Sequence, residues 1–243
     1  MKHYWINIDK CIERKIFMET QLHTKNIENY RISAETPETI SLYSIIRNNE
    51  SINTPEEIAC ILSHLKAIKK GYDDGDEYFC ILEDDMKINK LDFNKLFTYI
   101  NKAQEKDNNK IELVQLYTNS HPFIIKMFSE NTIGDTDYKD FIIKRTEDCP
   151  STGYYLISRI GAKKLLDLFI LSPTYFDLSY SFWTAADNVL YRPINSYILT
   201  YPIAVSIIEY GSTIHPEHLG NHRNANLVIK QIWSINSQLY KMV

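Results

Sequence analysis

The sequence predicts one α/β domain whose sheet is largely parallel and flanked by helices. In the first half of the chain, stretches with strand character alternate with stretches of helical spacing. The stretch Tyr78–Leu82 is apolar without alternation, as in a strand that is covered on both faces. No Pro-, Gly- or Ser-rich linker interrupts the 243 residues. The range 1–243 is therefore predicted to be a single domain.

Each element follows from local pattern. The expected strands, in chain order, are His3–Ile8, Asn29–Ala34, Tyr78–Leu82, Ile111–Tyr117, Phe141–Arg145 and Gly153–Ser158. The expected helices are Ile12–Leu22, Thr54–Gly71, Asp92–Ala103, Ser158–Phe169 and Asn224–Met242. The second helix has the clearest signals. Thr54 is its expected N-cap, Glu57 completes a capping box, and Gly71 is expected to close its carboxyl end.

Composition excludes several classes of function. The net charge is −4 and the basic residues are spread along the chain, so a nucleic-acid partner is not expected. Cys11, Cys60, Cys80 and Cys149 form no C-x-x-C pair, which predicts free thiols. The chain opens without a signal-peptide pattern, and the apolar stretch Ser196–Ile208 is too short to cross a bilayer. A cytoplasmic protein without a membrane span is expected, and the abundance of Ile, Asn and Lys suggests an AT-rich host or virus.

Three adjacent acids, Glu83, Asp84 and Asp85, follow the apolar stretch directly. Adjacent carboxylates repel one another, so the group is either a solvated loop or the site of a cation. In an open α/β sheet, ligands bind beyond the carboxyl ends of the strands, and carboxylates there can share a divalent cation with phosphates. The other Asp-x-Asp patterns, at 74–76 and 135–137, contain or follow glycine and are expected to be solvated turns.

Four segments resemble glycosyltransferase family 25 and occur in the order of that family. They are "YWINIDKCIERK" (4–15), "EIACILSHLKAIKKG" (57–71), "ILEDDM" (81–86) and "STGYYLISRIGAKKLL" (151–166). The chain departs from the family pattern at Ile8, at Ala59 and in the residues before Gly153, and the match thins beyond Leu166. The family includes bacterial lipopolysaccharide and collagen galactosyltransferases. The resemblance implies a GT-A-type, Rossmann-like fold.

The resemblance also implies roles for individual residues on the donor side. The donor-binding residues would be Asn7, Asp9, Arg14, His64, Glu83 and Asp84. The ligands of Mn²⁺ or Mg²⁺ would be Asp85, Glu83 and His215, with His222 as the alternative to His215. For Asp9, a helix N-cap is an equal alternative. For His64 the alternative is a structural histidine, and for Arg14 a surface ion pair.

The resemblance also implies an inverting transfer, which needs a base that removes the proton from the acceptor hydroxyl. Asp187 is the candidate, by a loose resemblance to an acid of the family, and a helix-start residue is its alternative. Asp177 is the competing acid, and Trp183 is placed to stack on a sugar. Among the late histidines 215, 218 and 222, a separate zinc site is the less favoured alternative, and Arg223 is a possible diphosphate contact.

The sequence therefore predicts a metal-dependent, inverting glycosyltransferase. It would move a hexose, first of all galactose, from a UDP-sugar to a hydroxyl of a glycan or a modified protein. The donor-binding part would span about 1–120 and the acceptor-side part about 121–243. The alternatives are a homologue that binds nucleotide-sugar or glycan without turnover, and a metal-dependent hydrolase with water as nucleophile.

Overall fold

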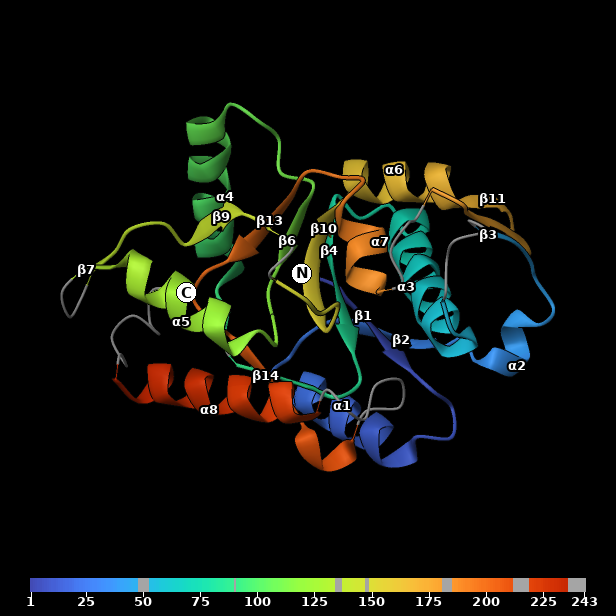
Figure 1. Cartoon of the computed structure of the whole chain (residues 1–243), viewed down its shortest axis with the longest axis horizontal. Coiled ribbons are helices and arrows are strands. Elements are labelled where there is room, and N and C mark those ends of the chain that lie inside the picture. Colours follow the sequence, from blue (N-terminus) through green and yellow to red (C-terminus); the bar gives the residue numbers. More distant parts are fainter. Residues whose placement is uncertain are drawn as a thin grey trace.

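The structure is a computed structural model that describes residues 1–47, 53–89, 91–133, 137–146, 149–180, 185–211 and 219–235. A seven-stranded sheet lies at its centre, in the order β2-β1-β4-β10-β6-β13-β9 (Figure 1). These strands are β1 (His3–Asn7), β2 (Asn29–Ser33), β4 (Tyr78–Glu83), β6 (Leu113–Gln115), β9 (Ile142–Lys144), β10 (Tyr154–Ser158) and β13 (Ser196–Leu199). Only β9 and β10 run against the other five strands of this sheet. The predicted α/β class with a mostly parallel sheet is confirmed.

Helices cover both faces of the sheet (Figure 1). One face packs against α3 (Pro55–Asp73), α6 (Arg159–Phe169) and α7 (Ala186–Tyr191). The other packs against α1 (Ile12–Thr24), α4 (Phe93–Asp107), α5 (His121–Asn131) and α8 (Leu219–Ile235). Along β4, Phe79 and Ile81 enter the first core, while Cys80 and Leu82 enter the second. Successive side chains of a strand point to opposite faces, so an apolar run without alternation fills both cores.

Smaller elements surround the sheet. A three-stranded sheet contains β11 (Ile170–Ser172), β12 (Tyr175–Leu178) and β3 (Ser44–Arg47). Two short ladders pair β5 (Met86–Ile88) with β14 (Ala204–Ser206), and β7 (Thr132–Ile133) with β8 (Asp137–Tyr138). The short helices are α2 (Pro37–Ile40) and η1 (Ile208–Tyr210). The β5–β14 ladder brings the late part of the chain beside the residues that follow the acidic motif.

The predicted capping box of α3 is present, because Thr54 and Glu57 each bond to the backbone of the other. The prediction that Gly71 ends this helix is wrong, since α3 continues to Asp73. A Cβ at Gly71 would lie 2.5 Å from the ring of Phe79. The glycine is therefore needed for close packing of helix and strand. The last helix begins at Leu219, earlier than predicted, and the part of the prediction beyond Ile235 lies outside the described residues.

Two predictions from composition can be compared with the structure. The four cysteines are free, as predicted, with Cys80 and Cys149 buried and Cys11 and Cys60 half-buried. Within the described ranges, no helix is both long and apolar enough to cross a membrane.

Candidate functional site

The acidic motif lies where β4 ends, and its first two acids point to opposite sides of the sheet. Glu83 is the last residue of β4 and approaches His64 of α3. Asp84 approaches Arg14 of α1. The alternation of the strand thus continues into the motif and separates two carboxylates that the sequence places side by side.

Asp84 is the centre of a buried polar cluster. Asn7 Nδ2 donates a hydrogen bond to its carboxylate at 2.6 Å, and Arg14 Nη1 donates another at 2.8 Å. Burial raises the pKa of Asp84, and the charge of Arg14 and the bond from Asn7 oppose that rise. Arg14 Nη2 also donates to the backbone carbonyls of Tyr210 and Gly211, at 3.0 and 2.8 Å. Three predicted donor-binding residues are therefore bonded to one another, and they tie α1 to the segment after β14.

Glu83 is held from two sides. Thr152 Oγ1 donates to Glu83 Oε1 at 2.7 Å, and His64 Nε2 lies 3.4 Å from the same oxygen. His64 Nδ1 in turn lies 3.1 Å from the hydroxyl of Tyr155. Burial acts to raise the pKa of Glu83, but the contacts with His64 and Thr152 outweigh it and lower that pKa. His64 is fully buried, so its visible role is to orient Glu83.

Asp85 differs from its two neighbours. No side chain in the described part of the chain forms a hydrogen bond or ion pair with its carboxylate. Only its backbone is fastened, because Asp85 O accepts a bond from Ile207 N at 2.7 Å. Burial, followed by the negative charge of Glu83, raises the pKa of Asp85 to about 7. The charge of Arg14 opposes this rise only in part, so Asp85 is the acid of the motif whose charge is least compensated.

The unpaired carboxylate bears on the predicted metal. Asp85 and Glu83 supply the hard oxygen atoms that Mn²⁺ or Mg²⁺ prefers, and a cation would relieve their repulsion. Across the described ranges, no group of three or more His, Cys, Asp or Glu side chains is arranged to hold a metal ion. A cation at these two carboxylates would therefore need further oxygen atoms, from a ligand or from water, to complete its coordination. The third predicted ligand, His215, lies outside the described residues, as do Trp183 and His218.

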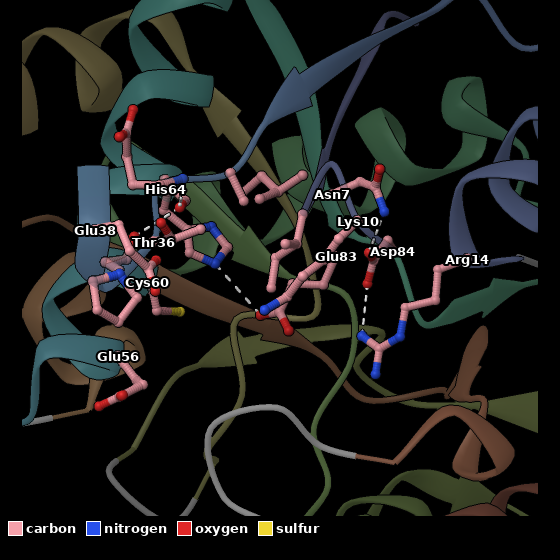
Figure 2. A pocket seen from close by; sticks show the side chains of 17 residues that line it. Asn7, Lys10, Arg14, Thr36, Glu38, Glu56, Cys60, His64, Glu83 and Asp84 are labelled. Atoms are coloured by element: carbon pink, nitrogen blue, oxygen red, sulfur yellow. Dashed lines mark hydrogen bonds and ion pairs between the residues drawn. The ribbon is translucent and has the colours of Figure 1, made fainter. Parts of the chain in front are cut away.

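A cavity of about 400 Å³ opens beside the motif (Figure 2). Its lining includes most of the predicted donor-binding residues, namely Asn7, Arg14, His64, Glu83 and Asp84. Its size lies within the range of small-molecule sites. Lys10 also lines it and is exposed. Its ammonium group forms no hydrogen bond or ion pair with a described side chain, although its charge helps to lower the pKa of Glu38 on the same lining. Sequence reasoning missed Lys10, although its place just after β1 was the available signal.

Asp9 is not among the residues that line this cavity. Its carboxylate pairs with Arg31 and accepts a bond from Ser33 Oγ at 2.9 Å. The bonds from Arg31 and Ser33 lower the pKa of Asp9. Asp9 is not the helix N-cap either, because Cys11 occupies that position of α1. Its donor-binding role stays a prediction, and the structure places it just beyond the carboxyl end of β1, beside the end of β2.

Asp187 lies near the start of α7 and is buried. Ser151 N and Asn188 N donate to its carboxylate at 3.1 and 2.8 Å, and Arg145 Nη2 lies 3.5 Å away. Ser151 has a φ of 102°, a left-handed conformation that is costly for a serine. Asp187 therefore helps to hold the turn that presents Thr152 to Glu83. Its role as the base stays a prediction.

Among the remaining candidates, three acids lie away from the motif and one histidine lies near it. Asp177 is in β12, where its carboxylate accepts bonds from Ser179. Asp74 and Asp76 lie at the amino end of β4, away from the motif, and both accept a bond from Tyr4. His222 lies closer, since its charge acts on Glu83. Its ring nitrogens contact the hydroxyl groups of Tyr117 and Ser206 and the amide of Asn119.

Comparisons with solved structures give distant likenesses. A197 from STIV is 13% identical over 82% of this chain and 81% of that chain, with a TM-score of 0.40. A glycosyltransferase involved in the glycosylation of the major capsid of PBCV-1 is 13% identical over 90% of this chain and 89% of that chain, with a TM-score of 0.39. Mouse xyloside xylosyltransferase 1, in its apo form, is 10% identical over 65% of this chain and 53% of that chain, with a TM-score of 0.31. No curated protein matches the chain.

The family comparison is more specific. Residues 1–180 match the profile of glycosyltransferase family 25 (LPS biosynthesis protein). This range contains the acidic motif, the cavity that Asn7 and Lys10 line, and the Thr152–Gly153 turn. The matched range confirms the resemblance that the four sequence segments indicated, and the chain belongs to glycosyltransferase family 25.

Proposed function

We propose that this protein is a metal-dependent, inverting glycosyltransferase that uses a UDP-sugar. The observation that carries the proposal is the difference between the three acids of the motif. Asp84 and Glu83 are each fixed by two side chains, whereas the carboxylate of Asp85 faces no partner in the described part of the chain. A site that fixes two acids and leaves the third without a bonded side chain is suited to a ligand that arrives with a cation.

In the proposed reaction, a hydroxyl of the acceptor attacks the anomeric carbon of the sugar. The new C–O bond forms as the bond to the diphosphate breaks, the hydroxyl proton passes to a base, and UDP leaves. A divalent cation at Asp85 and Glu83 would offset the charge that develops on the diphosphate. Lys10 lies on the lining of the cavity and is the proposed contact of a phosphate group. Galactose is the first candidate sugar, followed by glucose and N-acetylglucosamine.

Asp187 is the proposed base, and its ion pair with Arg145 is the observation that weighs against it. Asparagine in its place keeps an oxygen that can accept the bond from Ser151 N but cannot take a proton. If Asp187 is the base, Asp187→Asn lowers the transfer rate about a hundredfold to a thousandfold and leaves donor affinity unchanged. The two quantities are measured by initial rates and by calorimetric titration of UDP-sugar. If Asp187→Asn transferred the sugar at the wild-type rate, Asp187 would not be the base, and its role would be limited to holding the turn at Ser151.

The experiment that tests the function measures UDP and glycoside product together. The protein is incubated with UDP-galactose, UDP-glucose or UDP-N-acetylglucosamine and Mn²⁺, with and without a panel of simple glycosides. A transferase forms UDP and product in equal amounts and depends on the acceptor. Free sugar formed equally without acceptor would favour a hydrolase. Binding of a UDP-sugar with neither product would favour the non-catalytic homologue.

A further inference from the structure

A second cavity, of about 780 Å³, is lined by residues of α1 that follow Arg14. It is bounded by α1, the β5–β14 ladder, η1 and α8, and we call it the α1–α8 cavity. Figure 1 shows α1, β14 and α8 close together at the lower edge of the molecule, and α8 packs on β14 and η1. Lys87, which lines the cavity, is two residues after Asp85 in the sequence. One end of the cavity is therefore close to the acidic motif.

The two cavities share a wall. Arg14 lines the first cavity and Tyr210 lines the second. Arg14 donates to the carbonyl oxygen of Tyr210 at 3.0 Å, and its guanidinium lies 5.7 Å from the centre of that ring. A molecule in the α1–α8 cavity would therefore be a neighbour of a molecule in the first cavity.

Three lysines give the α1–α8 cavity a positive charge. Lys25, Lys87 and Lys230 line it and are exposed, and none has an ion-pair partner among the residues that the structure describes. Glu209 is the one carboxylate of its lining. By contrast, the ammonium groups of Lys66, Lys106 and Lys164 each lie within 3.0 Å of a carboxylate oxygen. Unpaired cations gathered at one cavity favour an anionic occupant.

Aromatic side chains also line the α1–α8 cavity and give it apolar surface. Phe17, Tyr210 and Trp233 line the same cavity and are half-buried. The rings of Phe17 and Tyr210 meet edge to face at 6.1 Å, and Trp233 Nε1 is anchored to the carbonyl of Pro202 at 2.7 Å. Fixed rings beside charged groups suit a ligand with both an apolar face and a negative charge. A pyranose ring that carries a carboxylate or phosphate has both.

We infer that the α1–α8 cavity binds an anionic saccharide, held by Lys25, Lys87 and Lys230 and by the aromatic rings. We also infer that this saccharide is the acceptor, and that part of the inference rests on the proposed function. The binding of the saccharide does not depend on the proposed function, because neither the donor nor the metal takes part in the binding.

Binding is tested on the full chain by following the indole N–H resonance of Trp233, assigned with Trp233→Phe. Two anionic probes, 3′-sialyllactose for a carboxylate and glucose 6-phosphate for a phosphate, are titrated beside their neutral partners, lactose and glucose. We expect at least one anionic probe to bind tenfold or more tightly than its neutral partner, and less tightly as salt is raised. The probe that binds identifies the source of the charge.

The double variant Lys87→Ala/Lys230→Ala is expected to weaken that binding about threefold to tenfold. The control, Lys102→Ala/Lys139→Ala, removes the same charge at exposed positions that do not line the cavity. This control should bind the probe as tightly as the wild type. Equal binding of charged and neutral probes, no binding of either anionic probe, or equal loss in both double variants would overturn the inference. If transfer occurs but anionic probes do not bind, this inference fails and the proposed function stands.

Discussion

Asp85→Asn is expected to lower the rate of glycosyl transfer about a thousandfold or more. The substitution removes a charged oxygen ligand from the proposed cation, and with it several kcal/mol of stabilisation of the leaving diphosphate. Initial rates with saturating UDP-sugar and Mn²⁺ measure the loss. Asp167→Asn, in the exposed Lys163–Asp167 pair of α6, is the matched control and should be fully active. A rate within tenfold of wild type would contradict the role of Asp85.

The same substitution is expected to stabilise the metal-free protein at alkaline pH. The pKa of Asp85 is raised from 3.8 to about 7 in the folded state, so the folded chain binds more protons than the unfolded chain between these values. The carboxylate therefore destabilises the fold increasingly as pH rises from about 4 to about 7, and fully above that range. In EDTA at pH 8, Asp85→Asn should raise the free energy of unfolding by roughly 1–3 kcal/mol. The gain should vanish near pH 4, and a loss at pH 8 would contradict the account.

Asp84→Ala is expected to lower the free energy of unfolding by about 3–5 kcal/mol, although Asp84 is adjacent to Asp85. The substitution leaves the guanidinium of Arg14 and the amide of Asn7 buried without their partner. For a chain of this length the melting temperature should fall by about 10 °C. Thermal unfolding in EDTA measures the change without interference from a bound cation.

Two further variants show whether the loss of stability in Asp84→Ala comes from the buried ion pair. Asp167→Ala breaks an exposed pair and should cost less than about 1 kcal/mol. The double variant Arg14→Met/Asp84→Leu removes both charges and should be more stable than Asp84→Ala alone. If Asp84→Ala costs no more than Asp167→Ala, the buried cluster does not hold α1 to the motif.

The parts of the fold that local pattern determines could be predicted from the sequence. The capping box at Thr54 and Glu57 involves residues three apart, and the run Tyr78–Leu82 shows its burial in its own composition. The helix α5 was missed, although Phe123, Ile124 and Met127 recur at helical spacing and are buried. The β5–β14 ladder was not predictable, because pairing across more than a hundred residues leaves no local pattern.

The candidate site shows the same division. The acidic motif was found because three acids after an apolar strand are unusual within one short segment. Its internal contacts were not predictable: Arg14 meets Asp84 across 70 residues, and Thr152 meets Glu83 across 69. For this reason the sequence assigned Asn7, Arg14 and Asp84 separately to the donor, whereas the structure bonds them to one another. The family resemblance already assigned Asp85 to the metal and Asp84 to the donor, but only the contacts show that Asp84 is bonded by Asn7 and Arg14 while no described side chain bonds to the carboxylate of Asp85.

Thermal unfolding of the wild type and of Asp85→Asn with UDP-galactose, UDP-glucose and UDP-N-acetylglucosamine, in Mn²⁺ or in EDTA, tests the donor site most directly. A ligand at about a hundred times its dissociation constant adds roughly 2.7 kcal/mol to the stability of the folded state. The account predicts stabilisation of the wild type by at least one UDP-sugar in Mn²⁺, lost in EDTA and lost in Asp85→Asn. Stabilisation by none of the three, or equal stabilisation of Asp85→Asn, would contradict it.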